Sequence, residues 1–153
     1  WIMPFKSALS LFMSAFLLLQ SSATFSAGAS GTPSGLSIED LSEIRNVIVG
    51  QLNAFKIDDA EKAFSYATPN IRRIFGSAEM FLGMVRKSYR SLYRPQSYTL
   101  QALNRVRGQI IQPLSVIGPS GNAQIALYIM ELQPDGTWKI GACLLADEPG
   151  IDT

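Results

Sequence analysis

The sequence predicts an α+β domain in which N-terminal helices pack on one face of a curved antiparallel four-stranded sheet. Between residues 37 and 94, apolar side chains recur every three or four positions, which is typical of amphipathic helices. After Pro95 the apolar period changes to two, which is the period of β-strands. Helices that are followed by consecutive strands, rather than alternating with them, indicate the α+β class.

The N-terminal segment has the features of a secretory signal peptide. One lysine lies within residues 3–6, and an apolar run follows from Ala8 to Leu19. That run is shorter than the roughly 20 residues that span a bilayer, and small residues suited to cleavage come after it. We expect residues 1–29 to be removed after Ala29, with Ala23 as the alternative, and the protein to be exported to the periplasm or the medium. The alternative interpretation is an uncleaved amphipathic or anchoring helix.

The remainder of the chain is predicted to form a single domain. Residues 30–36 are rich in Gly, Ser, Thr and Pro, and we expect them to form a flexible linker. Residues 37–147 then form the α+β domain, and residues 148–153 a C-terminal tail. A length of about 100 to 150 residues is usual for one domain with one core.

Capping residues mark the first two predicted helices. Ser37 is a good N-cap, and apolar residues with helical spacing follow it as far as Phe55. Asp58 is predicted to cap a second, short helix, in which Asp59 and Glu61 favour the positive end of the helix dipole.

Two further helices are predicted before the sheet. Thr68 and Pro69 form a cap followed by proline at the first helical position, and Gly76 ends that helix. The next helix begins at Ser77, and Pro95 cannot continue it.

Basic residues recur along this last helix. Arg86, Arg90 and Arg94 are four residues apart, so a continuous helix would place them on one face, with Lys87 beside them. Such a face suits an anionic ligand or an acidic partner, although a solvated surface is the more frequent explanation.

Four strands are predicted after Pro95. Pro113 lies inside the second run and predicts an edge strand or a bulge, and Asp135-Gly136 between the last two runs is a strong hairpin signal. The four runs are Ser97–Leu103, Gln109–Ile117, Asn122–Gln133 and Thr137–Ala146.

Both faces of the last hairpin are predicted to be largely apolar. If the last two strands pair about Asp135-Gly136, their residues fall into two sets, one on each face of the hairpin. The first set is Ile125, Leu127, Ile129, Ile140, Ala142 and Leu144, and the second is Ala126, Tyr128, Met130, Gly141, Cys143 and Leu145. Because helices can cover only one face, we hypothesise that the open face is buried against a second copy in a homodimer.

Composition excludes several classes of chemistry. Histidine is absent, which removes imidazole metal sites and Ser-His or Cys-His nucleophiles, and Cys143 is the only cysteine, so no intramolecular disulfide forms. Without Lys6, the chain carries 12 basic and 12 acidic residues, which argues against a nucleic-acid binder. We expect no cofactor, no metal and no transmembrane segment in the mature protein.

An ordered series of short motifs resembles a known family. The motifs are Glu43–Ile48, Gln51–Phe55, Asp58–Ile71, Phe75-Gly76, Met84–Arg86, Tyr89, Arg94-Pro95 and Asp135–Ile140. The chain is similar in them to bacterial exported proteins called domain of unknown function 4864. The resemblance implies a cone-shaped, cystatin-like fold similar to nuclear transport factor 2, in which helices and a curved sheet surround a pocket. It implies no activity.

Candidate pocket residues are those that combine an apolar body with a polar end. For each candidate tyrosine, the alternative to a pocket role is ordinary packing in or beside the core. For Glu131, the alternative is a solvated position near the turn. Arg94 ends its helix, where a cation favours the dipole, and its side chain is long enough to reach into the domain. The candidates are Tyr66, Tyr89, Arg94, Tyr98, Tyr128 and Glu131.

Two functional hypotheses follow. The first is a non-enzymatic module that binds a small apolar or anionic ligand or acts as a dimeric interaction module. The alternative is a cofactor-independent isomerase or dehydratase, which needs a carboxylate in an apolar pocket and a tyrosine donor. Glu131 is the first candidate for the base, and Asp58 and Asp59 are others, although helix capping explains that pair.

Overall fold

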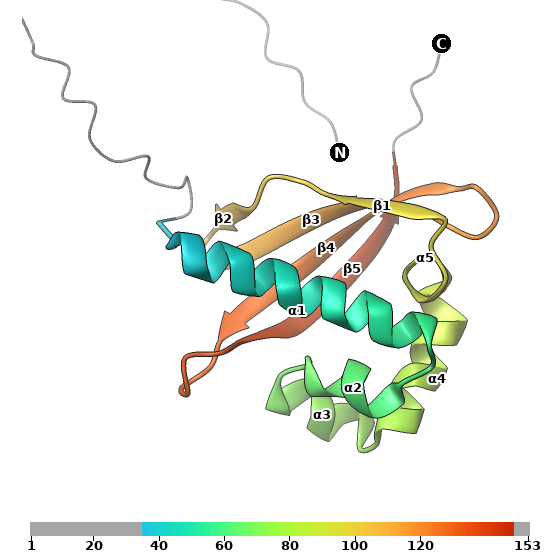
Figure 1. The fold of residues 1–153 in the computed structure, drawn as a ribbon, viewed down its shortest axis with the longest axis horizontal. Coiled ribbons are helices and arrows are strands. Elements are labelled where there is room, and N and C mark those ends of the chain that lie inside the picture. Colours follow the sequence, from blue (N-terminus) through green and yellow to red (C-terminus); the bar gives the residue numbers. More distant parts are fainter. Residues whose placement is uncertain (1–34, 149–153) are drawn as a thin grey trace, which may run out of the picture.

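The computed structural model describes residues 35–148 and confirms the α+β class. Helices come first and strands second along this part of the chain (Figure 1). The helices are α1 (Ile38–Lys56), α2 (Ala60–Ser65), α3 (Pro69–Phe75), α4 (Ala78–Ser88) and α5 (Arg90–Tyr93). The strands are β1 (Ser97–Leu100), β2 (Asn104–Val106), β3 (Gln109–Ile117), β4 (Ala123–Leu132) and β5 (Trp138–Asp147). The predicted signal peptide, residues 30–34 of the predicted linker and residues 149–153 lie outside the described residues.

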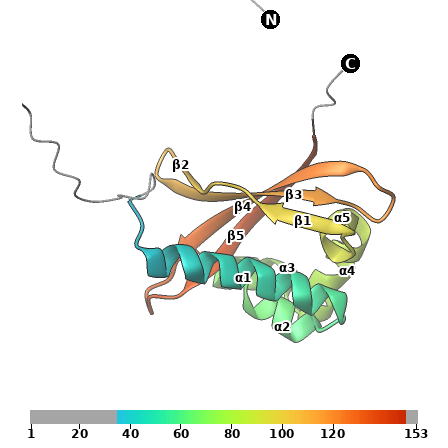
Figure 2. The ribbon, with the colours of Figure 1, turned by 45° about the horizontal axis from the view of Figure 1, so that its top comes forward.

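The helices lie on one side of a twisted antiparallel sheet (Figures 1 and 2). The strand order is β1-β3-β4-β5, and β2 pairs with the other end of β3. Helix α1 crosses the sheet, while α2, α3 and α4 lie together beyond its C-terminal half (Figure 2). The junction of α2 and α3 extends the sheet edge, because the N–H of Thr68 donates to the carbonyl of Ile140 over 3.0 Å.

The sheet has five strands where the sequence predicted four, because the first predicted run, Ser97–Leu103, ends early as β1, and β2 forms after it in residues outside the predicted runs. The sheet edge that β1 and β2 form along β3 is interrupted at residues 101–103. Its interruption lies opposite Pro113, which has no N–H to donate to the neighbouring strand. The side-chain amide of Gln112 donates instead to the carbonyl of Gln101 over 2.6 Å. Beyond the interruption, β2 turns back into β3 at Arg107 and Gly108, which both have positive φ, as a tight hairpin requires.

Helix α1 begins as its sequence predicts. The Ser37 hydroxyl accepts from the N–H of Asp40 over 3.0 Å, and the Asp40 carboxylate accepts from the N–H of Ser37 over 3.0 Å. This reciprocal capping box satisfies two donors that a helix start leaves unpaired. The predicted apolar stripe is buried from Ile44 onward, with Ile44, Ile48 and Leu52 fully inaccessible to solvent, whereas Ile38 in the first turn is 77 % exposed.

Two predictions about the later helices were wrong. The second helix is capped by Asp59, which accepts from the N–H of Lys62 over 3.0 Å, while Asp58 adopts a left-handed conformation with φ of 56°. The predicted helix from Ser77 ends at Tyr89 and restarts as α5, because Tyr89 has a non-helical backbone. The predicted stripe of three arginines on one helix face is therefore interrupted.

The hairpin faces were predicted correctly except around a β-bulge. In β4, Ala126, Tyr128 and Met130 are buried, so this set faces the helices. The register shifts between Ile129 and Met130, which pairs Met130 with Ile140 and turns Ile140 to the helix face. The sequence placed Ile140 on the opposite face, because a strict period of two cannot contain the extra residue.

Candidate ligand cavity

An apolar cavity of about 240 Å³ lies between the helices and the sheet. It exceeds the roughly 150 Å³ of an engineered protein cavity that binds benzene. The side chains around it come from the first, third, fourth and fifth helices and the last two strands, and none is charged. The lining residues are Gln51, Phe55, Ala67, Ile71, Phe75, Phe81, Met84, Val85, Tyr89, Leu92, Tyr128, Ile140, Ala142 and Cys143.

The burial of its walls shows where the cavity opens. Lining residues of α1 and β4, such as Phe55 and Tyr128, are almost completely buried. Those of α3 and the middle of α4, such as Ile71, Phe75 and Met84, are half-buried, as is Cys143 on β5. The accessible side of the cavity therefore lies between α3, α4 and β5.

The most informative polar group of the cavity is the Tyr128 hydroxyl. The Tyr128 side chain is 1 % exposed, and its hydroxyl has no partner of good hydrogen-bond geometry among residues 35–148, where the Cys143 thiol is the neighbour that interacts with it. The pKa of Tyr128 is raised well above its ordinary value, mainly by burial and secondly by the nearby Cys143 thiol. The hydroxyl therefore keeps its proton. Sulfur is only a weak acceptor. A buried hydroxyl without a strong partner costs about 1–3 kcal/mol, which an acceptor atom of a bound ligand would remove.

The other polar groups of the wall are already engaged or inert. The Tyr89 hydroxyl donates to the backbone carbonyl of Cys143 over 3.0 Å, and the Gln51 amide donates to the carbonyl of Ala63 over 3.1 Å. Burial raises the pKa of the Cys143 thiol to about 12, so it stays protonated near neutral pH. Among residues 35–148, Tyr128 is thus the lining residue whose buried side-chain polar atom lacks a strong partner.

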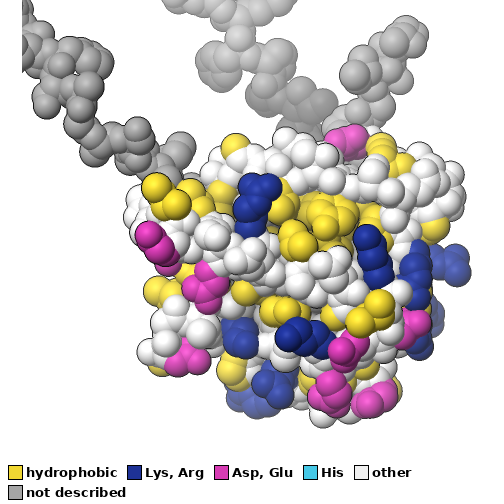
Figure 3. Space-filling model, in the orientation of Figure 1, with side chains coloured by type: hydrophobic (Ala, Val, Ile, Leu, Met, Phe, Trp, Pro, Cys, Tyr) yellow, Lys and Arg dark blue, Asp and Glu magenta, His cyan; other side chains and the backbone are white. Residues whose placement is uncertain are grey.

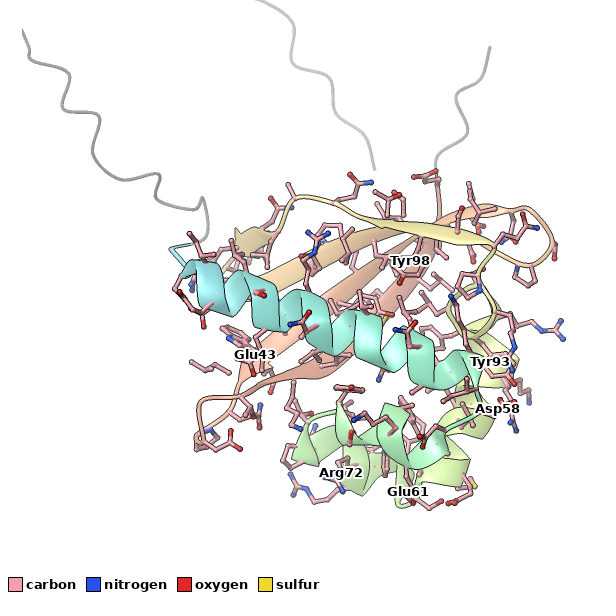
Figure 4. The ribbon with its side chains drawn as sticks, viewed as in Figure 1. Glu43, Asp58, Glu61, Arg72, Tyr93 and Tyr98 are labelled. Atoms are coloured by element: carbon pink, nitrogen blue, oxygen red, sulfur yellow. The ribbon has the colours of Figure 1, made fainter. Side chains whose placement is uncertain are left out.

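The six sequence-predicted pocket residues do not lie together. Tyr89 and Tyr128 line the cavity. Tyr66 packs over Gly50 on α1, which has no side chain to obstruct the ring, and Tyr98 lies half-buried between β1 and α1 (Figure 4). Figure 3 shows apolar surface exposed in that same region.

Glu131 and Arg94 lie outside the cavity wall. Glu131 alternates with Tyr128 and Met130 along β4, so its exposed side chain is on the other face of the sheet. The Arg94 guanidinium lies 3.9 Å from the ring centre of Tyr93 and donates to the carbonyl of Phe55, at the end of α1. Arg94 therefore secures the end of α1, a role that its place before Pro95 does not reveal.

Asp58 is the centre of a second polar cluster, on the surface where α1 ends (Figure 4). Its carboxylate accepts from Arg86 over 2.9 Å, from Arg94 over 3.1 Å and from the Tyr93 hydroxyl over 2.5 Å. The Tyr93 and Arg86 hydrogen bonds lower the pKa of Asp58 to about 2. The cluster joins the turn after α1 to α4 and α5, which explains its residues without a ligand.

Replacing Asp58 with asparagine should lower the thermal unfolding midpoint at pH 7, and the difference from the unmodified protein should shrink as the pH approaches 2. The folded-state pKa lies below the ordinary 3.8, so the carboxylate stabilises the fold above pH 3.8. That contribution is lost as the pH falls through about 2. Asparagine tolerates the left-handed backbone, so the substitution tests the charge.

Asp59→Asn is the matched control, because it makes the same charge change at the next residue and asparagine remains a good N-cap. Its midpoint should stay near that of the unmodified protein at both pH values. Equal shifts in the two variants would contradict a specific role for Asp58.

The sequence predicts that most cavity residues are buried in the core, but it does not predict that they surround a cavity. Phe55, Ile71, Phe75, Met84 and Val85 belong to the apolar residues between positions 37 and 94 whose helical spacing predicts an inner face. Gln51 was missed, although it lies three residues after Ile48 on the same stripe, and a polar residue on a buried stripe is a usable signal.

Within residues 35–148, no helix has the length and apolar character needed to cross a membrane. In the same part of the chain, no group of three or more Cys, Asp or Glu side chains is arranged to hold a metal ion.

The fold and the cavity define a small α+β domain with an apolar, uncharged interior site. The chain belongs to the family described as Domain of unknown function (DUF4864), whose model matches residues 37–153. Comparison with curated proteins found no match, and comparison with solved structures found none.

Proposed function

We propose that this domain binds a small, uncharged and mainly apolar molecule that carries one hydrogen-bond acceptor, such as a carbonyl or ether oxygen. The observation that carries the proposal is the buried Tyr128 hydroxyl, which lines an apolar cavity and lacks a strong partner. The apolar part of the ligand would be stabilised by burial, and Tyr128 would orient its polar atom. The nuclear transport factor 2-like cone and export to the periplasm or medium are compatible with this proposal.

The lining favours one of the ligand classes that the sequence left open, the apolar one. An anionic ligand inside the cavity would have no cation to pair with, since none of the lining side chains is charged. The isomerase or dehydratase alternative needs a carboxylate in the cavity, whereas Glu131, Asp58 and Asp59 are exposed and outside its wall. This geometry supports binding of an apolar ligand rather than proton abstraction.

A fluorescence titration with the neutral probe N-phenyl-1-naphthylamine tests the proposal. The unmodified protein should show saturable enhancement, because the probe is apolar and becomes bright on leaving water. Met84→Trp narrows the cavity near its opening, where Met84 is half-buried, and should weaken the affinity for the probe at least about tenfold, the equivalent of 1.4 kcal/mol.

Met80→Trp provides the matched control. Met80 lies one turn earlier on α4 and is 66 % exposed, so the same substitution adds the same bulk outside the cavity. Its probe affinity should equal that of the unmodified protein. Binding that is not saturable, or that is equally strong in Met84→Trp, would refute the cavity as the binding site.

A second candidate function is self-association through the sheet face opposite the helices. On that face the side chains of β3, β4 and β5 are mainly apolar and partly accessible, and Leu144 is 58 % exposed. Apolar sheet of this kind is often an interface. The side chains concerned are Ile111, Pro113, Ile125, Leu127, Ile129 and Leu144.

Native mass spectrometry of protein purified from its own cell envelope addresses both candidates at once. A mass of one chain plus a small apolar compound supports the ligand proposal alone, and a mass of two chains supports self-association. A bare single chain would count against both.

A further inference from the structure

A second, polar groove lies beside α4 and α5, separate from the apolar cavity. Its volume is about 440 Å³, and none of its lining residues lines the cavity. One side is formed by the end of α4 and by α5, and the other by the turn between β3 and β4. Lys87, Arg90, Ser120 and Asn122 are on its walls.

The two cations of the groove are not neutralised by a neighbouring acid. Both salt bridges found within residues 35–148 use Asp58, and they occupy Arg86 and Arg94. Lys87 and Arg90 take part in neither, and both are exposed. Figure 3 shows lysine and arginine side chains gathered at the edge of the molecule where α4 and α5 lie. The basic residues of this region thus form two pairs. Arg86 and Arg94 bind Asp58, whereas Lys87 and Arg90 line the groove and form no salt bridge within residues 35–148.

Few acids lie around the groove among residues 35–148. Glu79 is the only acid on α4 and α5, and it lies at the opposite end of α4. Asp147 on β5 is the acid linked to the groove, since its carboxylate accepts from the Gln124 amide over 2.8 Å. The groove itself therefore carries two positive charges, with one carboxylate held at its margin.

The floor of the groove is rigidly built. The Ser91 side chain donates to the Gln124 amide oxygen over 2.5 Å, and Ser91 is only 3 % exposed. Gly118 brings the turn close to α5, because a Cβ there would lie 2.5 Å from both the Ser91 hydroxyl and the Asn122 amide oxygen. The N–H of Gly118 donates to the carbonyl of Asn122 over 2.9 Å, which closes the turn. The cationic wall and the turn are thereby held at a defined separation.

We propose that this groove binds a phosphate group through Lys87 and Arg90, with further donors from Ser120 and Asn122. Cations on one wall and neutral donors on the other suit a tetrahedral oxyanion, whose oxygens point in several directions. The site is independent of the apolar cavity, and it takes the charged ligand that the cavity excludes.

An NMR titration of amide shifts with inorganic phosphate, at constant ionic strength set with chloride, tests this site. Saturable shifts are expected at Ser91, Ser120 and Asn122. Arg90→Gln and Lys87→Gln should each weaken phosphate binding about tenfold or more, because each removes a charge-assisted contact. Arg45→Gln, an exposed substitution on α1, removes the same charge elsewhere and should have no effect.

Two further arms complete the experiment. Gly118→Ala should weaken phosphate binding while leaving both cations in place, since it displaces the turn. Phosphatidylcholine vesicles with and without phosphatidic acid show whether the phosphate can belong to a lipid headgroup, through binding that Arg90→Gln reduces.

Phosphate shifts no larger than those caused by chloride, together with no phosphatidic acid dependence, would overturn the proposal. Equal weakening by Arg45→Gln and Arg90→Gln would also overturn it, because that result indicates general charge screening. Probe binding in the apolar cavity should be the same in all of these variants, so failure of one site is distinguishable from failure of the other.

Discussion

Replacing Phe81 with alanine is expected to lower the free energy of unfolding by about 3–5 kcal/mol. Phe81 is 7 % exposed and lies at the centre of an aromatic cluster. Its ring centre is 5.3 Å from that of Phe64, 5.5 Å from that of Phe75 and 6.2 Å from that of Phe55. These contacts join α1, α2, α3 and α4, and the lost ring would enlarge a cavity that the packing already leaves open.

Urea unfolding measures this loss. Phe81→Leu keeps much of the side-chain volume and should cost less than half as much as the alanine variant. Ile74→Ala on α3 is the surface control, because Ile74 is 66 % exposed, and its effect should stay within about 0.5 kcal/mol. A loss below about 1 kcal/mol for Phe81→Ala would show that the cluster does not hold the helices together.

Replacing Tyr128 with phenylalanine is expected to change stability and ligand binding in opposite directions. Removing a buried hydroxyl without a strong partner should raise the free energy of unfolding by about 1–2 kcal/mol. The same substitution should weaken binding of a carbonyl-containing ligand about tenfold, because the donor that orients it is lost. A group that reduces stability yet increases affinity serves binding rather than folding.

Tyr89→Phe is the matched control for this result. The Tyr89 hydroxyl has a partner in the fold, the carbonyl of Cys143, so its removal should lower the free energy of unfolding by about 0.5–1.5 kcal/mol. If Tyr128→Phe is also destabilising, the Tyr128 hydroxyl has a strong partner in the folded protein and the ligand proposal loses its main support.

The order and the type of the main elements follow from local sequence. Ser37, Thr68 and Ser77 begin helices as predicted, because the capping hydrogen bonds join residues only three positions apart. The strands are recognisable by their period of two, and Asp135-Gly136 marks the last turn. The family resemblance noted in the sequence was likewise confirmed by the family model.

The candidate sites depend on contacts that local sequence does not contain. The helix break at Tyr89 is stabilised by a hydrogen bond to residue 143, and the orientation of Ile140 depends on a bulge against β4. Asp58 looks like a helix cap until α4 and α5 place two arginines beside it.

The sequence by itself determined the α+β class, most helix starts and which faces are apolar. Only the tertiary structure decided that the buried faces leave a cavity and that the Tyr128 hydroxyl in its wall lacks a strong partner. It also decided that Lys87 and Arg90 line a groove and form no salt bridge within residues 35–148. The physical reason is that periodicity reports the direction of a side chain relative to its own helix or strand. A cavity is the volume left between segments far apart in the chain, and it depends on how all of their side chains fit together.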